Sequence, residues 1–146
     1  MKKVLIIGAI ALAVSVLVSS AGAAVKPATV ATARTGLGRM LVDGHGRSLY
    51  LFEKDTHGRS ACSGACAAYW PPLLTSGKAV AIKGAKPSLL GSIARPGGGR
   101  QVSYAGHPLY FFAGDTRSGQ VTGEGLQDFG AGWYALSPAG MKIDRD

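Results

Sequence analysis

Two cysteines and a histidine lie close enough in the sequence to share one metal ion. His57, Cys62 and Cys66 fall within ten residues, and Asp55 could supply a fourth donor. Thiolate and imidazole groups are common ligands of zinc, and they also bind copper. A zinc or copper site, and with it a metal- or redox-active protein, is therefore one hypothesis for this stretch.

The same two cysteines also favour a disulfide. The chain contains only Cys62 and Cys66, and its start indicates export to an oxidising compartment. If residues 62–66 form one helical turn, the two Cα atoms lie about 6 Å apart, within the reach of a disulfide. So short a ring stabilises a fold by only about 2 kcal/mol. With the thiols oxidised we expect no cofactor, whereas free thiols would favour zinc or copper.

A second candidate for chemistry is a pair of aspartates, Asp55 and Asp115. Each ends an aromatic block, because residues 49–56 (LYLFEKDT) return as residues 109–116 (LYFFAGDT). If the two blocks pack together, the carboxylates could act as an acid–base pair. The chain has no nucleophile elbow, no His-Glu-x-x-His and no phosphate-binding loop. We therefore predict no enzyme and interpret the carboxylates as acceptors that fix the loops behind each block.

The duplicated block predicts a duplicated fold. In each copy an apolar run, a Gly-bearing turn and the aromatic block form a hairpin, and a Trp-bearing segment supplies a third strand. Alternation along each block sends successive side chains to opposite faces, so both faces need cover. For Tyr69 and Trp133, burial and exposure on a sugar- or peptide-binding surface are both open. The motif residues that we interpret as structural are Tyr50, Phe52, Asp55, Trp70, Tyr110, Phe112, Asp115 and Trp133.

We predict a mainly β protein with two tandem three-stranded antiparallel repeats that pack as one pseudo-symmetric domain with short helical turns. Residues 24–36 are rich in Ala, Thr and Val without periodicity, and we expect a flexible tether there, with a first strand at its end as the alternative. The expected boundaries are 37–140 for the domain, 37–76 and 97–140 for the repeats, 77–96 for the linker and 141–146 for a C-terminal tail.

Residues 1–23 have the features of a signal peptide. Two lysines precede an apolar run at residues 4–18, and Ala21 and Ala23 are the small residues before a cleavage site. The run is shorter than the roughly 20 residues that span a bilayer, so cleavage is favoured over retention as an anchor. We expect a secreted protein, extracellular or periplasmic, without a transmembrane anchor in its mature form.

The charge balance limits the classes of partner. Two of the 16 basic residues leave with the signal, so the mature chain has 14 against 8 acidic residues, a net charge of +6. These bases are scattered and not interleaved with aromatics, which argues against a nucleic-acid partner. A diffuse positive charge suits attraction to anionic cell-envelope polymers.

Several linked motifs resemble one bacterial family. Tyr-x-aromatic-x-x-Asp begins at Tyr50 and at Tyr110, and the first copy also has Cys-x-x-x-Cys-Ala before Trp-Pro-Pro-Leu. The second copy has Gly-His-Pro-Leu-Tyr and Phe-Gly-Ala-Gly-Trp-Tyr. From residue 37 to 140 the chain resembles the predicted lipoproteins known as the secreted repeat of unknown function. It departs from them in having no cysteine near residue 23 to take a lipid, and in having Ala105 where Asn would suit a tight turn before Gly.

The resemblance implies export and leaves the activity unassigned. We therefore expect a secreted repeat domain of the cell envelope with a non-enzymatic binding or structural role. The alternative is a metal- or redox-active envelope protein that uses His57, Cys62 and Cys66.

Overall fold

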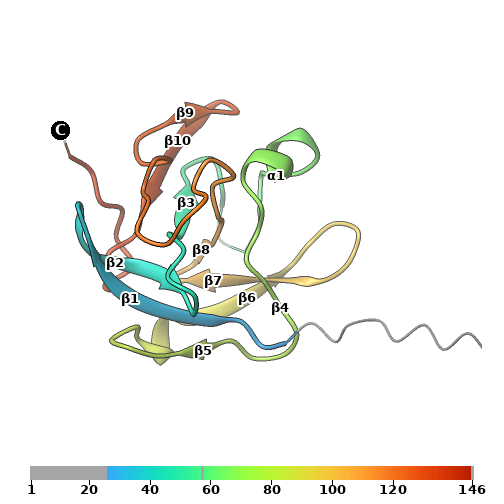
Figure 1. Ribbon diagram of the computed structural model, residues 1–146. Helices are drawn as coiled ribbons and strands as arrows, with labels where there is room; N and C mark the ends of the chain where they lie inside the picture. The colour runs from blue at the N-terminus through green and yellow to red at the C-terminus, as the bar shows by residue number, and fades with distance from the viewer. Residues whose placement is uncertain (1–25, 57, 146) are drawn as a thin grey trace, which may run out of the picture.

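Each repeat begins with two strands that form a hairpin. The computed structural model describes residues 26–56 and 58–145. In the first repeat β1 (Thr29–Thr35) pairs antiparallel with β2 (Gly38–Asp43), and in the second β6 (Leu90–Ala94) pairs in the same way with β7 (Arg100–Tyr104). The two hairpins correspond strand for strand, and they lie in the lower half of the molecule in Figure 1.

The remaining strands join the two repeats. β3 (Tyr50–Phe52) of the first repeat pairs with β10 (Ala131–Ala135) of the second, and β9 (Gln127–Asp128) completes that sheet. β4 (Leu74–Thr75) of the first repeat pairs with β7, which also carries β8 (His107–Pro108). The third sheet has the order β2-β1-β5, with β5 at Val80–Ala81. The predicted mainly β fold is confirmed. Its two repeats are interleaved because β3 and β4 of the first repeat lie in sheets with strands of the second.

Helical structure in the described residues is limited to two short elements. α1 (Ala65–Tyr69) lies in the upper half of the molecule in Figure 1, and η1 (Pro87–Leu89) starts with a proline, a residue common at the first position of a helix. α1 ends at Tyr69, because the next residue, Trp70, precedes Pro71, and a residue before proline disfavours the helical conformation.

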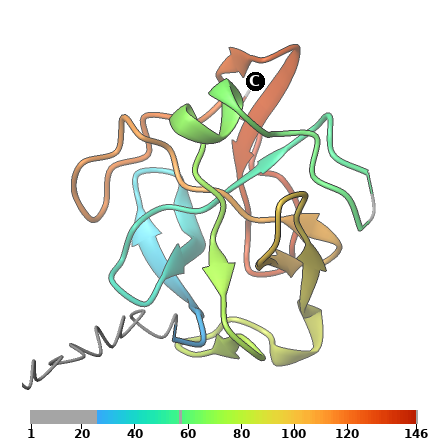
Figure 2. The same cartoon turned by 90° about the vertical axis from the view of Figure 1, so that its right-hand side faces the viewer.

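A local two-fold relation centres on Tyr50 and Tyr110. The N–H of each donates to the C=O of the other, at 2.9 and 3.0 Å. The surrounding bonds also repeat: Leu41 N–H donates to Leu136 O at 2.9 Å, and Val102 N–H donates to Leu73 O at 2.8 Å. The aromatic blocks therefore meet at the centre of the molecule, where the copies cross (Figure 2).

The two faces of the aromatic blocks are covered by different clusters. Leu49 and Leu51 belong to a mainly aliphatic cluster, and Tyr50 and Phe52 belong to an aromatic one that holds both tryptophans. In the second block Leu109 and Tyr110 divide in the same way. This is the two-faced burial that period-2 alternation predicts.

Two expectations for the N-terminal region need comment. The tether expected at residues 24–36 is wrong for Thr29–Thr35, because this stretch is β1, which lies between β2 and β5. Val30 is fully buried there, and Ala31 is nearly so. The predicted signal peptide, residues 1–23, lies outside the described residues, and within them no helix is long and apolar enough to cross a membrane.

Candidate functional site: a crossed tyrosine–aspartate network and a disulfide loop

The tyrosine of each repeat motif donates its hydroxyl to the aspartate of the other repeat. Tyr50 Oη donates to Asp115 Oδ2 at 2.5 Å, and Tyr110 Oη donates to Asp55 Oδ2 at 2.8 Å. Both tyrosines are fully buried. The crossing follows from the central pairing of Tyr50 with Tyr110, since that pairing turns each ring toward the other copy's loop.

The second oxygen of each carboxylate holds the loop that follows it. Asp55 Oδ1 accepts the Ala61 N–H at 2.6 Å, and Asp115 Oδ1 accepts the Thr122 N–H at 2.9 Å and the Thr122 hydroxyl. The bonded residues lie six and seven positions downstream. Each carboxylate thus connects a loop of its own repeat to a tyrosine of the other.

Burial keeps the hydroxyls of this network protonated. It raises the pKa of Tyr50 and of Tyr110 well above the ordinary phenol value, and the adjacent carboxylates add to the effect. Burial also raises the pKa of Asp55, although its hydrogen bonds from Ala61 and Tyr110 act in the opposite direction. Both tyrosines therefore remain donors at neutral pH.

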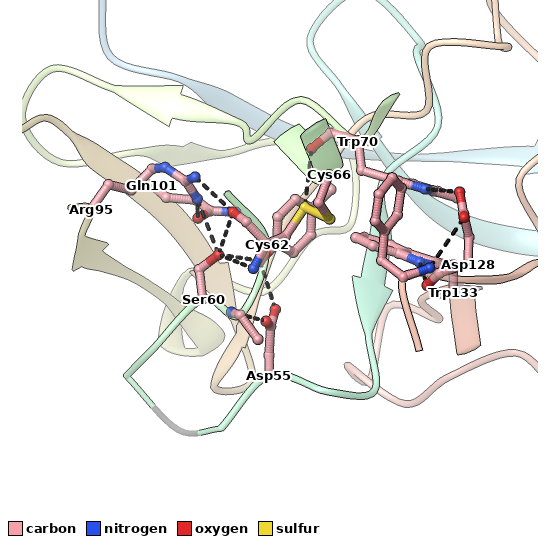
Figure 3. The surroundings of a disulfide bond; sticks show 12 residues. Asp55, Ser60, Cys62, Cys66, Trp70, Arg95, Gln101, Asp128 and Trp133 are labelled. Atoms are coloured by element: carbon pink, nitrogen blue, oxygen red, sulfur yellow. Dashed lines mark hydrogen bonds between the residues drawn. A yellow bond between two sulfur atoms is a disulfide. The ribbon is translucent and has the colours of Figure 1, made fainter. Parts of the chain in front are cut away.

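Four aromatic rings stack alternately from the two repeats. Phe52 lies on Trp133 with ring centroids 4.0 Å apart, Trp133 lies on Trp70 at 3.9 Å, and Trp70 meets Phe112 at 4.5 Å. Both indoles are fully buried, so Trp133 belongs to the core, whereas Tyr69 is 58% exposed. Asp128 holds both indole N–H groups: its carboxylate accepts from Trp70 at 3.2 Å and its carbonyl from Trp133 at 3.0 Å (Figure 3).

The predicted disulfide between Cys62 and Cys66 is confirmed. Their Cα atoms lie 5.2 Å apart. Only Cys66 lies in α1, so the bridge ties the loop to the helix and does not span one helical turn. Within residues 26–56 and 58–145 no cysteine is free.

Arg95 supports the disulfide loop from the other repeat. Its guanidinium donates to Cys62 O at 2.9 Å, to Ser60 Oγ at 3.1 Å and to Gln101 Oε1 at 2.6 Å (Figure 3). Ser60 also lies 2.7 Å from the hydroxyl of Tyr110. The loop that differs most between the copies is therefore joined to the central network.

The metal hypothesis does not fit this donor set. Both thiols are used in the disulfide, and a thiolate is the form of cysteine that binds zinc. His57 lies outside the described residues. In the part of the chain that the structure describes, no three His, Cys, Asp or Glu side chains lie together as a metal site would need.

A cavity of about 590 Å³ opens beside Asp55. The charged side chains Glu53, Asp55 and Lys142 that line it already form hydrogen bonds or ion pairs within the protein. Asp55 uses both oxygens in the bonds given above, and Lys142 forms ion pairs with Glu53 at 2.9 Å and Asp144 at 3.0 Å. Asp115 is 4% exposed and bonds to Tyr50, and in the described residues no hydrogen bond joins the two carboxylates. Both carboxylates that the sequence suggested as an acid–base pair therefore use their oxygens in internal hydrogen bonds.

Sequence reasoning missed several residues of this network, namely Ser60, Arg95, Gln101, Thr122 and Asp128. Ser and Thr are ordinary loop residues, so nothing in the sequence distinguished Ser60 or Thr122. Asp128 carried a weak signal, because it stands beside the Phe-Gly turn before the second tryptophan.

Comparison with known proteins identifies the family alone. No curated protein and no solved structure matches the chain. Residues 31–74 and 91–137 each match the family described as a secreted repeat of unknown function. The two matches begin in β1 and β6 and end in β4 and just after β10, so they coincide with the two interleaved copies. The chain therefore belongs to the family of secreted repeats of unknown function.

Proposed function

We propose that this chain is a non-enzymatic module that binds anionic polymers of the cell envelope, and that its repeat motif maintains the fold. One observation carries the non-enzymatic part. Both oxygens of Asp55 and of Asp115, and the hydroxyls of Tyr50 and Tyr110, take part in internal hydrogen bonds. A general acid or base must instead reach a proton of the substrate.

The binding part is supported by charge. The mature chain carries a net charge of +6, and the described ion pairs of lysine involve only Lys142. Positive surface charge raises the local concentration of polyanions and speeds their association. Envelope polymers with phosphate groups are the partner class that this charge favours.

Co-sedimentation with isolated bacterial cell walls tests the proposal. The mature protein, residues 24–146, is mixed with intact walls and with walls from which the phosphate polymers have been removed. We expect it to pellet with intact walls at about 0.1 M salt and to be released at about 1 M, where the Debye length falls from about 10 Å to about 3 Å. Equal binding to stripped walls would exclude the polyanion, and no binding to either would reject envelope binding.

The non-enzymatic part has its own test. Asp55→Asn offers one acceptor oxygen where the carboxylate offers two, so we expect a lower melting temperature. The matched variant Asp115→Asn should behave similarly. The contrary result has two parts: the wild type turns over wall material, and Asp55→Asn abolishes this turnover without lowering the melting temperature. That result would show that Asp55 is catalytic.

A further inference from the structure

Three exposed apolar side chains lie around β4 and β5. Leu74, Val80 and Ile82 are 46%, 48% and 37% exposed, and they are half of the large apolar residues that are exposed among those described. Val80 lies in the edge strand β5, and Ile82 follows that strand directly, with its N–H bonded to Val30 O at 2.9 Å. Period-2 alternation directs Val80 and Ile82 to the same side, while Ala81 between them packs on the core. Leu74 and Ile82 border one cavity of about 450 Å³. We call this surface the β4–β5 face.

The β4–β5 face is also basic. Between Asp55 and Asp115 the sequence has no acidic residue, and that stretch includes β4 and β5. Lys26 borders the cavity with Leu74 and Ile82, and Lys78 and Arg100 border a second cavity of about 370 Å³. Leu74 and Arg100 together border a third cavity, which connects the two groups of residues. The six bases of the acid-free stretch are Arg59, Lys78, Lys83, Lys86, Arg95 and Arg100.

The single acidic residue that borders these two cavities is already engaged. Asp43 Oδ1 accepts the backbone N–H groups of His45 and Arg47, both at 2.9 Å, in the turn after β2. Arg100 uses two groups of its guanidinium on Ser92, at 2.9 and 3.0 Å, and this leaves further N–H donors for an anion. Lys26, Lys78 and Arg100 thus outnumber the one carboxylate that borders these cavities, and the net charge of the face is positive.

We propose that the β4–β5 face docks on the surface of an anionic lipid bilayer. Leu74, Val80 and Ile82 enter the headgroup region, and Lys26, Lys78 and Arg100 meet the lipid phosphates. Exposed apolar side chains flanked by basic residues are the combination that binds anionic membrane surfaces, with both terms contributing to affinity. In Figures 1 and 2, β5 and the start of β1 lie together at the lower end of the molecule, so the face occupies one end.

The apolar part distinguishes lipid from a soluble polyanion. A phosphate polymer would be attracted by the lysines and arginines, and it would gain nothing from three exposed aliphatic side chains. A bilayer gains from both, because apolar area leaves water when the face inserts. The inference goes beyond the proposed function, because a lipid bilayer is a second anionic surface besides the polymers of the cell envelope.

Vesicle co-sedimentation tests the inference. The mature protein is mixed with vesicles of phosphatidylglycerol and phosphatidylcholine, or of phosphatidylcholine alone. We expect binding to the anionic vesicles only. Val80→Ser with Ile82→Ser should weaken it by about tenfold, a change that corresponds to about 1.4 kcal/mol. Lys78→Ala should also weaken it, and more so at low salt.

A matched control uses exposed apolar residues elsewhere. Leu126 and Met141 are 37% and 69% exposed and lie outside the face, so Leu126→Ser with Met141→Ser should bind vesicles like wild type. The circular dichroism of each variant confirms folding. Lys78→Ala leaves the apolar side chains in place, so it tests the face even if the double serine variant unfolds.

Three outcomes would overturn the inference. The first is that the wild type does not bind anionic vesicles at low salt. The second is that the face variants and the control variant bind equally well. The third is that the serine substitutions abolish a dimer seen in light scattering, which would assign the face to a second copy of the chain. Binding to cell walls without binding to vesicles would reject the lipid face and leave the proposed function intact. Failure with both would reject the two together.

Discussion

At the residue scale, the tyrosine and the aspartate of the repeat motif form hydrogen bonds between the two copies. The sequence shows that tyrosine and aspartate recur five positions apart, and this spacing places them in one block. It could not show that Tyr50 bonds to Asp115 and Tyr110 to Asp55. That arrangement depends on a main-chain pairing between segments sixty residues apart, and no local pattern encodes such a pairing.

A double-mutant cycle would measure the crossing directly. Tyr50→Phe and Asp115→Asn should each lower the free energy of unfolding by about 1.5–3 kcal/mol, the range for hydrogen bonds to charged groups. The double variant should lose less than the sum by about 1 kcal/mol, because both changes remove one bond. Urea unfolding measures these values.

The same-repeat pair provides the control for that cycle. Asp55 bonds to Tyr110 and not to Tyr50, so Tyr50→Phe and Asp55→Asn should add to within about 0.5 kcal/mol. Stronger coupling within a repeat than between repeats would contradict the crossed network.

Two raised carboxyl pKa values predict how stability depends on pH. Burial raises the pKa of Asp55 and of Glu124 above their ordinary values of 3.8 and 4.5. Glu124 Oε1 is buried without a hydrogen bond, while Oε2 accepts the Ala135 N–H at 2.6 Å. At pH values between the ordinary pKa of each carboxyl and its raised pKa in the folded protein, the folded protein holds more protons than the unfolded chain. The contribution of both groups to the free energy of unfolding therefore falls as pH rises through their folded-state pKa values.

Comparison of Glu124→Gln with wild type isolates one of these contributions. The variant has no carboxyl at this position to deprotonate, so its stability relative to wild type should increase as pH rises from about 4 to about 7. Urea unfolding at several pH values measures the difference. Parallel pH profiles for the two proteins would show that Glu124 does not contribute.

At the element scale, hairpins could be predicted from turn residues and alternation, while the first strand could not. β1 consists mainly of Ala, Thr and Val, and its successive residues Val30, Ala31 and Thr32 are all buried. Both faces are covered along this part of the strand, so the sequence shows no clear alternation there. The turn between β7 and β8 has positive φ at both central residues, 51° at Ala105 and 82° at Gly106. Asn suits the first of these positions better than Ala, yet the turn forms with Ala105. A second turn of this kind, Phe129 and Gly130, joins β9 to β10.

Gly130→Ala tests the conformational demand of that turn. Gly130 has φ of 90°, and a Cβ there would meet only Lys54 Nζ at 3.7 Å, so the cost of alanine is conformational and not steric crowding. We expect a loss of about 1–2 kcal/mol in the free energy of unfolding. Gly36→Ala is the control, because Gly36 lacks a positive φ and a Cβ there would meet nothing within 4 Å. Equal stability of the two variants would show that the turn tolerates a side chain.

At the scale of the whole molecule, the two copies share one core. The rings of Phe52, Trp133, Trp70 and Phe112 alternate between repeats. Two of the sheets combine a strand of the first repeat with strands of the second. Duplication in the sequence predicted two units and a shared core, since each unit is too small to cover both faces of its block. It could not predict that β3 and β4 pair with strands of the second copy, because the register between copies is set by contacts distant in sequence.

Interleaving predicts that neither repeat folds alone. A fragment of residues 24–76 retains β1 to β4 but lacks the ring of Trp133, the carboxylate of Asp115 and the strands that pair with β3 and β4. Residues 77–146 lack the converse partners. We expect each fragment alone to show no near-ultraviolet circular dichroism, and an equimolar mixture to recover the signal of the intact chain, because stacked and buried indoles require both halves. A cooperative unfolding transition in either isolated fragment would mean that the repeats are independent units that merely pack together.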